Sequence, residues 1–379
     1  MALKFPFEAI CRVPDALFKK QLNFKVIEIR DALIQLFVGL GGIVMALNNF
    51  GVWSLVVPSV FASPIRAIII FRFTYWRPKL YLGISYWREI FKYSRNIIGS
   101  TLTSFIISNG DTLLIGKLLG PNLLGIYNIA WRSANLVNRS MLQISNKLTL
   151  PVLAKSEGDI AKLLISFRKM VCIIGLAAFP PIVALFVVAD VFILVVYGDK
   201  WVGAILPFRI LLIYALRFSV SSPVGSVFKA VGKPQIDFKI GVYIIPFYLI
   251  GIYLGSSYGI VGVATGVTIV RTLSGVISYY FVAKVLKKSF LAVIRPILQP
   301  LLLSIFLGII LSLVRLVLCF IGLNEPLTIL LISMLVGIIV FWLLLRNIFR
   351  SLSLEILNYL THIIPTKTFI LLSKLLKQN

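Results

Sequence analysis

The stretch LTILLISMLVGIIVFWLLL (residues 327–345) has no charged side chain over its whole length. A helix that crosses the hydrocarbon core of a bilayer needs about 20 mostly apolar residues. The stretch therefore predicts a transmembrane helix, and comparable stretches recur along the chain. Ten candidate spans are found: residues 27–47, 50–72, 94–115, 121–147, 170–196, 204–228, 238–255, 258–283, 292–319 and 327–345.

The composition agrees with this prediction. The chain has 379 residues, of which 59% are hydrophobic and 13% charged, and its mean hydropathy is +0.99. A soluble domain is about half apolar and about a quarter charged. The soluble, disordered and disulfide-rich secreted classes are therefore excluded. The sequence predicts an all-α polytopic membrane protein.

The charges indicate the orientation of these spans. The chain carries 38 lysines and arginines against 13 acids, a net charge of +25. Most of the cations lie in every second connection, whereas the intervening turns hold only Lys117 and Lys200. Because positively charged loops stay in the cytoplasm, both termini are predicted to be cytoplasmic, which requires an even number of spans. No basic soluble region remains to bind nucleic acid.

Four regions follow from this arrangement. Residues 1–26 form a cytoplasmic leader, and residues 27–93 hold the first two spans with a cytoplasmic loop. Residues 94–345 hold the remaining membrane helices. Residues 346–379 form a tail whose apolar side chains recur at helical spacing, as in Leu354, Leu357 and Leu360. This spacing predicts amphipathic helices lying at the cytoplasmic interface.

Five arginines lie inside predicted spans: Arg132, Arg209, Arg217, Arg271 and Arg315. A central arginine costs a membrane helix about 2.5–3.5 kcal/mol, so it usually faces the interior of a bundle or a water-filled cavity. Arg132, Arg217 and Arg271 lie near the middle of their spans. Arg209 and Arg315 lie closer to the outer ends, where a long side chain can extend to the interface.

Arg132 belongs to a polar helix face. Asn128, Arg132 and Asn135 are spaced by four and three residues, which places them on one side of a helix. Arg139, Gln143 and Asn146 continue this face, and the span 94–115 carries a second one with Asn96, Ser100, Thr103, Ser104, Ser108 and Asp111. Polar faces can also join helices to one another. With a central arginine included, they favour a water-filled lumen that contacts the substrate.

Asp111 is the one carboxylate well inside such a polar face. We expect it to neutralise Arg132 on the neighbouring helix, and a role in proton or ion coupling is the alternative. The lumen then carries more positive than negative charge. Because guanidinium groups bind phosphate and carboxylate through two parallel hydrogen bonds, a substrate with an anionic head fits this lumen and a hydrophobic cation does not. No role is assigned to Asp190 or Asp199.

No catalytic or metal-binding motif is found. The single histidine, His362, cannot supply a zinc site or a catalytic triad. The phosphate-binding GxxxxGK[ST] loop of ATPases does not occur. Cys11, Cys172 and Cys319 share no metal-binding spacing. The sequence therefore predicts that the protein is not an enzyme and has neither a cofactor nor a metal site.

Several stretches resemble a known family. VPDALFKKQLNFK (13–25), FGVWSLV (50–56) and RNIIGSTLTSFIISNGDTLLIGKLLGPNLLGIYNIAWR (95–132) are similar to Wzx-type polysaccharide or O-antigen flippases. These flippases belong to the multidrug/oligosaccharidyl-lipid/polysaccharide exporter superfamily. FKAVGKPQIDFKIG (228–241) and YGIVGVATG (258–266) are similar as well. Asp111 and Arg132 match positions where members of this family commonly carry Asp and Arg.

The resemblance implies a transporter of lipid-linked oligosaccharide across the bacterial inner membrane, in lipopolysaccharide or exopolysaccharide biosynthesis. It implies a MATE-like fold of two helical bundles around a cationic cavity, working by alternating access. The substrate-binding arginines would be Arg132, Arg217 and Arg271. The implied partners are the lipid-linked substrate, membrane lipids and polysaccharide-assembly proteins.

The resemblance also implies a departure from the family's length. The leader is similar to the end of a fourth span and the loop after it, so we expect about four N-terminal spans to be lacking and the N-terminal bundle to be incomplete. Two other functions stay open. A multidrug antiporter of the same fold predicts deep acidic residues, and a membrane oligosaccharide polymerase predicts a long outer loop with catalytic groups.

Overall fold

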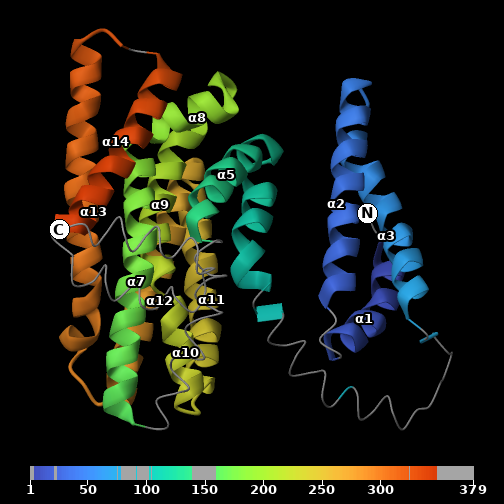
Figure 1. Ribbon diagram of the computed structural model, residues 1–379, viewed down its shortest axis with the longest axis horizontal. Coiled ribbons are helices and arrows are strands. Elements are labelled where there is room, and N and C mark those ends of the chain that lie inside the picture. The colour runs from blue at the N-terminus through green and yellow to red at the C-terminus, as the bar shows by residue number, and fades with distance from the viewer. Residues whose placement is uncertain are drawn as a thin grey trace. The chain divides into compact units, whose positions relative to one another are not determined.

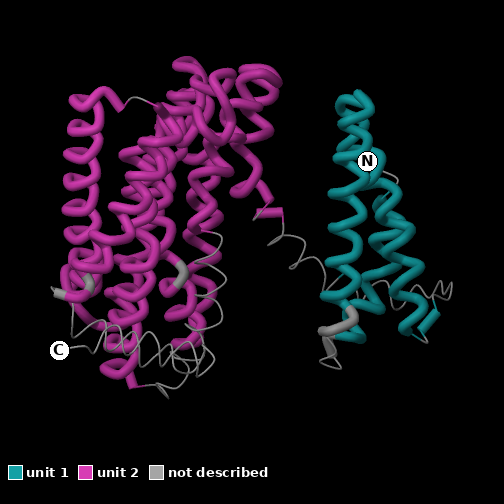
Figure 2. Tube along the Cα trace, turned by 45° about the horizontal axis from the view of Figure 1, so that its top comes forward, with its two compact units in different colours: residues 1–92 teal, residues 93–379 magenta. Residues whose placement is uncertain are grey.

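The computed structural model describes residues 4–20, 24–74, 76–77, 91, 102–103, 105–138, 159–323 and 325–347. Every regular element in these ranges is a helix (Figure 1). The ranges contain eight helical stretches that are long and apolar enough to cross a membrane. The predicted class, an all-α polytopic membrane protein, is confirmed. The chain divides into two compact units, residues 1–92 and 93–379 (Figure 2).

The first unit contains α1 (Lys4–Lys20), α2 (Phe24–Leu47) and α3 (Trp53–Phe73). α2 and α3 pack against each other, and α1 packs mainly against α3. Cys11 and Phe18 of α1 are buried against Ala67 and Ile70 of α3. The segment predicted as a leader is therefore largely helical, because its apolar side chains have a helix face to cover.

A group of charged residues joins the same helices. Arg30 of α2 is only 2% exposed and forms ion pairs with Asp15 of α1 and with its neighbour Asp31. Arg66 of α3 lies 3.6 Å from Asp31. A buried guanidinium is tolerated only when carboxylates and hydrogen bonds compensate its lost hydration. This group therefore fixes how α1 docks on the hairpin of α2 and α3.

The second unit contains the remaining helices. They are a helical run at 105–118, α5 (Pro121–Ala134), α7 (Ile160–Val187), α8 (Ala189–Tyr197), the 3₁₀ helix η1 (Asp199–Ala204), α9 (Ile205–Ser219), α10 (Ser222–Ala230), α11 (Gln235–Ser256), α12 (Gly259–Val285), α13 (Phe290–Phe320) and α14 (Pro326–Asn347). Figure 1 shows α13 and α14 beside α7, and α11 and α12 running alongside each other.

The structure corrects the predicted span 170–196. Its helix, α7, begins ten residues earlier at Ile160 because the Asp159 side chain accepts hydrogen bonds from the backbone amides of Ala161 and Lys162. α7 ends at Val187, and the chain turns at Val188 into the separate helix α8. The basic residues at the start of α7 are thus an extension of the helix and not a loop.

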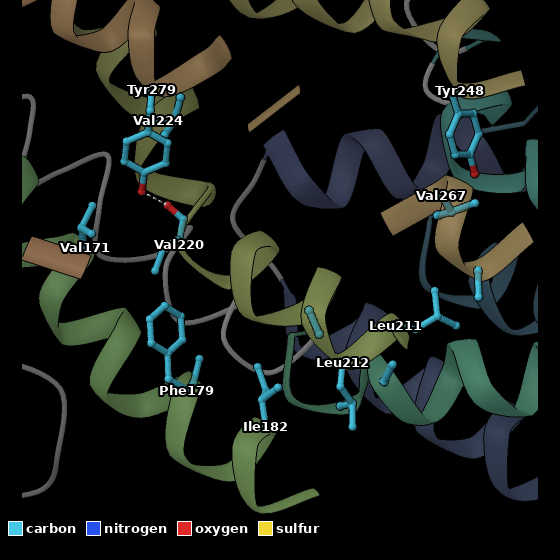
Figure 3. Packing of buried hydrophobic residues seen from close by; sticks show 14 of the residues in the cluster. Val171, Phe179, Ile182, Leu211, Leu212, Val220, Val224, Tyr248, Val267 and Tyr279 are labelled. Carbon is cyan, nitrogen blue, oxygen red and sulfur yellow. Dashed lines mark hydrogen bonds between the residues drawn. The ribbon is translucent and has the colours of Figure 1, made fainter. Parts of the chain in front are cut away.

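The predicted span 204–228 is interrupted. α9 ends at Ser219, and α10 begins at Ser222 with Pro223 in its first turn, where proline's missing amide costs nothing. The interruption frees carbonyl groups that lack helical partners. Tyr279 of α12 donates a hydrogen bond of 2.7 Å to the Val220 carbonyl (Figure 3). This bond allows a broken helix to lie inside a bundle where backbone groups must find protein partners.

The core of the second unit lies between α7, α9 and α12. Figure 3 shows Phe179 and Ile182 of α7 approaching the segment that carries Leu211, Leu212 and Val220. These side chains are buried, together with apolar residues of α5, α10, α11 and α13. In a bilayer such packing stabilises by close van der Waals contact, since lipid tails are as apolar as the side chains.

Glycines allow α11 and α12 to approach closely. A Cβ atom built on Gly255 would lie 2.4 Å from the Gly262 carbonyl oxygen, and one built on Gly266 would lie 2.4 Å from the Gly251 carbonyl oxygen. No side chain larger than hydrogen fits at these contacts. The four glycines form a small-residue interface of the kind that brings membrane helices together.

Three sequence predictions fall partly or wholly outside the described residues. The spans 94–115 and 121–147 are described only over their helical parts within 102–103, 105–118 and 121–138. The tail predicted at 346–379 lies outside the described residues beyond Asn347. The cytoplasmic placement of the termini stays a prediction.

The contact between α11 and α12 yields a stability prediction. We expect Gly255→Val to force the two helices apart and to destabilise the protein by about 1–3 kcal/mol, the usual cost of overpacking. The measurement is the melting temperature of the purified protein in detergent. Gly39→Val in α2 is the control, because a Cβ there meets nothing within 4 Å. An equal effect of both substitutions would contradict the role of this contact.

Candidate functional site

The second unit has a partly open cavity of about 460 Å³ between its membrane helices, which we call the polar cavity because charged side chains line it. Residues of α9, α10, α11 and α12 line it, together with Thr103 and Ile107. Its polar side chains include Arg217, Ser221, Asp237, Arg271, Ser274 and Ser278. A cavity that holds two arginines among apolar spans is the feature expected of a hydrated binding site and not of a lipid-filled gap.

Arg217, near the end of α9, lies against α12. A Cβ atom built on Gly275 would come within 1.8 Å of the Arg217 Nε, so the guanidinium occupies the space that a side chain at residue 275 would need. The Nε atom is buried and has no hydrogen-bond partner among the described residues. Within the same residues, Arg217 makes no ion pair with a carboxylate. It therefore offers the cavity an unpaired positive charge.

Arg271 is held quite differently. Its guanidinium donates hydrogen bonds of 3.1 Å to the Tyr214 hydroxyl and 2.9 Å to the Tyr248 hydroxyl, and it also donates to the Ile107 carbonyl. The same group lies over the rings of Trp131, Tyr214 and Tyr248, at 5.2, 5.3 and 4.8 Å from their centroids. Aromatic faces attract a desolvated cation by about 2 kcal/mol or more. Arg271 is thus a structural cation in an aromatic cage, although it borders the cavity.

Asp111 does not pair with Arg132, which corrects the expectation from the sequence. The Asp111 carboxylate is 1% exposed and accepts hydrogen bonds from the Tyr127 hydroxyl, at 2.9 Å, and from the Thr112 amide. Tyr127 and Arg132 both belong to α5, but five residues place them about 140° apart around the helix. The face that meets Asp111 is therefore not the face that carries Arg132.

The predicted polar face of α5 is only partly continuous. Arg132 is exposed and Asn128 is half-buried. Asn135 lies at the helix end and donates its side-chain hydrogen bond to the Trp131 carbonyl, 2.9 Å away. Asn96 and Ser100 lie outside the described residues. Among the described residues of the two predicted polar faces and the central arginines, Thr103, Arg217 and Arg271 line this cavity.

A second arginine group lies at the junction of α7 and α8. Arg315 of α13 donates to both oxygens of Asp190 and, at 2.9 Å, to the Val187 carbonyl. Arg209 of α9 donates to the same carboxylate at 3.3 Å. Burial raises the pKa of the Asp190 carboxyl, but the hydrogen bonds and charge of Arg315 outweigh burial and hold this pKa below its ordinary value. No role for Asp190 was predicted from the sequence.

Two further residues of the cavity were not predicted from the sequence. Asp237 lines the cavity from the first turn of α11, and Gly275 makes room for Arg217. For Gly275 the sequence does contain a signal. Arg271, Gly275 and Tyr279 are spaced by four residues, which places them on one face of α12. The aromatic cage had no such signal because its rings come from α5, α9 and α11.

A family comparison gives this geometry its context. Residues 1–206, more than half of the chain, match the family model described as polysaccharide biosynthesis protein. The chain belongs to this family. Its resemblance to Wzx-type proteins is confirmed, and with its apolar helices it is a multi-pass membrane protein.

The individual proteins to which this chain is similar are bacterial. It is 26% identical over 279 residues to the lipopolysaccharide biosynthesis protein WzxC of Escherichia coli K12, covering 71% of this chain and 55% of that protein. It is 25% identical over 225 residues to the teichuronic acid biosynthesis protein TuaB of Bacillus subtilis 168, covering 59% of this chain and 47% of that one. The chain thus spans about half the length of these relatives.

A solved structure shares the fold. The lipid II flippase MurJ, in an inward closed conformation, superposes with a TM-score of 0.69 over 85% of this chain and 68% of MurJ. The sequence identity is 15%, so this likeness shows the fold alone.

The cage around Arg271 makes a testable distinction between the arginines. We expect Arg271→Lys to destabilise the protein by about 2–4 kcal/mol, because an ammonium cannot reproduce the planar fork and its hydrogen bonds to several acceptors. Arg132→Lys, at an exposed position, is the matched control and should change stability little. The measurement is the melting temperature in detergent. A stable Arg271→Lys protein would show that the cage does not depend on the guanidinium.

Proposed function

We propose that this protein is a transporter that moves a lipid-linked oligosaccharide or polysaccharide precursor across the bacterial inner membrane by alternating access. Family membership and the names of its bacterial relatives support a role in surface-polysaccharide biosynthesis. The fold it shares with a lipid flippase supports transport and not catalysis. The alternation of basic and nearly uncharged connections supports an orientation with both termini in the cytoplasm.

The observation that carries the proposal is the unpaired guanidinium of Arg217 in the polar cavity. A charge held among membrane helices without a carboxylate partner is unfavourable unless water or a ligand compensates it. An anionic group of the substrate, a phosphate or a sugar carboxylate, matches this guanidinium through two parallel hydrogen bonds. Arg217 is thus assigned to contact the anionic part of the cargo.

The other predicted substrate residues receive different roles in this proposal. Arg132 is exposed on α5 and makes no ion pair among the described residues, so it remains available to an anionic cargo. Asn128, half-buried on the same helix, can add a hydrogen bond. Arg271 acts as a positioning residue, because its guanidinium holds Tyr214 and Tyr248 in the cavity wall.

The geometry gives less support to a multidrug antiporter of the same fold. A hydrophobic cation requires a deep, free carboxylate, whereas Asp111 is buried and bonded to Tyr127. Asp237 is an exposed acid in the first turn of α11 and shares its cavity with two arginines. The charge balance of the cavity therefore favours an anionic cargo.

A complementation experiment tests the role of Arg217. The variants are expressed in cells that lack the chromosomal gene, and surface polysaccharide is measured at equal membrane protein levels. We expect Arg217→Gln to lower export about tenfold or more, since hydrogen bonds to charged groups contribute about 1.5–3 kcal/mol. Lys239→Gln on α11 removes the same charge from an exposed residue that does not line the cavity, and it should export normally.

Gly275→Ala provides an independent test of the same guanidinium. The new methyl group would overlap Arg217 Nε and push the side chain out of its place without removing its charge. We expect export to fall as in Arg217→Gln, with little change in melting temperature, because a long side chain can move aside. Normal export by both variants would exclude Arg217 as a substrate contact.

A further inference from the structure

The second unit has another cavity, which is apolar, unlike the polar cavity around Arg217. It is a groove of about 500 Å³ between α7, α8, α13 and α14. Its lining is apolar except for Ser333 and includes Leu185, Phe192, Leu311 and Met334. None of its lining residues belongs to the polar cavity around Arg217. The groove is therefore unsuited to a sugar or a phosphate over its length.

The group formed by Arg209, Asp190 and Arg315 does not line this groove, but Asp190 and Arg315 stand on α8 and α13, two of its helices. Leu307 and Leu311 line the groove, and Arg315 follows at the same four-residue spacing on α13. Val188, at the turn before α8, and Phe192 of α8 line the groove on either side of Asp190 in sequence. Arg315 also donates to the Val187 carbonyl, where α7 and its apolar span end. The group thus lies at the level where a membrane span meets the head-group region.

The charges of this group do not balance. Two guanidinium groups share the single carboxylate of Asp190. Arg315 makes the closer contacts, whereas Arg209 reaches Asp190 through one bond of 3.3 Å. Arg209 Nε is buried without a partner among the described residues. One positive charge is left in excess near the apolar groove.

We propose that this groove is a binding site for an anionic phospholipid, with an acyl chain along the groove and the head-group phosphate at Arg209 and Arg315. An apolar channel with a cationic group nearby matches the two parts of such a lipid. The excess guanidinium selects a lipid with net negative charge over a zwitterionic one. In the orientation proposed above, the lipid belongs to the outer leaflet. The site is separate from the cargo cavity and does not depend on which substrate is carried.

The bound lipid would also complete the packing of α14. This helix joins the bundle through α13, α8 and α7, and the groove lies between it and α7. An acyl chain there would fill the space with van der Waals contacts that the protein itself does not supply. We therefore expect the lipid to stabilise the second unit.

Native mass spectrometry of the purified full chain provides the test, with phosphatidylglycerol and phosphatidylcholine offered in equal amounts. We expect bound phosphatidylglycerol to exceed phosphatidylcholine about fivefold, since one arginine near an anionic head group contributes about 1 kcal/mol. Arg209→Gln should bring the ratio close to one, and Arg209→Lys should keep most of it. Lys200→Gln removes a cation from η1, outside the groove, and should leave the ratio unchanged.

The groove itself is tested by Met334→Trp. Met334 is 56% exposed, so the larger side chain can be accommodated while it occupies groove volume. We expect it to reduce binding of both lipids and to abolish the rise in melting temperature that phosphatidylglycerol produces. A fivefold preference retained in Arg209→Gln would overturn the head-group assignment. Undiminished lipid binding by a folded Met334→Trp protein would overturn the assignment of the groove.

Discussion

The interactions of Arg271 organise the helices around the polar cavity. A guanidinium in a low-dielectric interior must replace all its lost hydration with protein groups. Tyr214, Tyr248, Trp131 and the Ile107 carbonyl supply these replacements, and they come from four different helical segments. Five segments, counting α12, are therefore held in one arrangement by a single side chain. The cavity keeps its shape because its wall is fixed by this charge.

The bundle also requires that the backbones of neighbouring helices approach each other closely. The glycines of α11 and α12 permit a contact that no other residue would allow, and Gly275 leaves room for Arg217 beside α12. The break between α9 and α10 is stabilised by Tyr279, whose hydroxyl satisfies a carbonyl exposed by that break. Small residues and one well-placed hydroxyl thus make space for a charged side chain within a packed bundle.

These features give the arginines of the spans different chemical roles. Arg271 is enclosed by aromatic rings, Arg209 and Arg315 share the carboxylate of Asp190, and Arg217 faces the cavity unpaired. The sequence treated Arg132, Arg217 and Arg271 alike because all three are cations near the middle of a span. A guanidinium without a carboxylate partner, such as that of Arg217, can offer its full charge to a ligand. A fold shared with MurJ at 15% identity does not decide between these roles, since function depends on the site and not on the fold.

Apolar length and the distribution of basic residues were enough to predict an all-α membrane protein and most of its spans. This information is local, because about 20 apolar residues suffice to identify a helix that the bilayer accepts. Helix ends were less predictable: α7 extends to an Asp159 cap, and the region 204–228 is broken at Val220. The resemblance to the family was recognisable in stretches such as residues 95–132.

The partners of each charged side chain were decided only by tertiary structure. The sequence predicted a pair of Asp111 and Arg132 because both lie on polar faces of neighbouring spans, but the rotation of α5 brings Tyr127 to that carboxylate instead. It could not show that Arg209 and Arg315 meet at Asp190, since they lie on helices more than a hundred residues apart. The sequence alone shows that charged residues lie within the membrane spans. The packing of the helices decided which of them are neutralised and which remain free to bind, because pairing depends on distances between helices that no local pattern encodes.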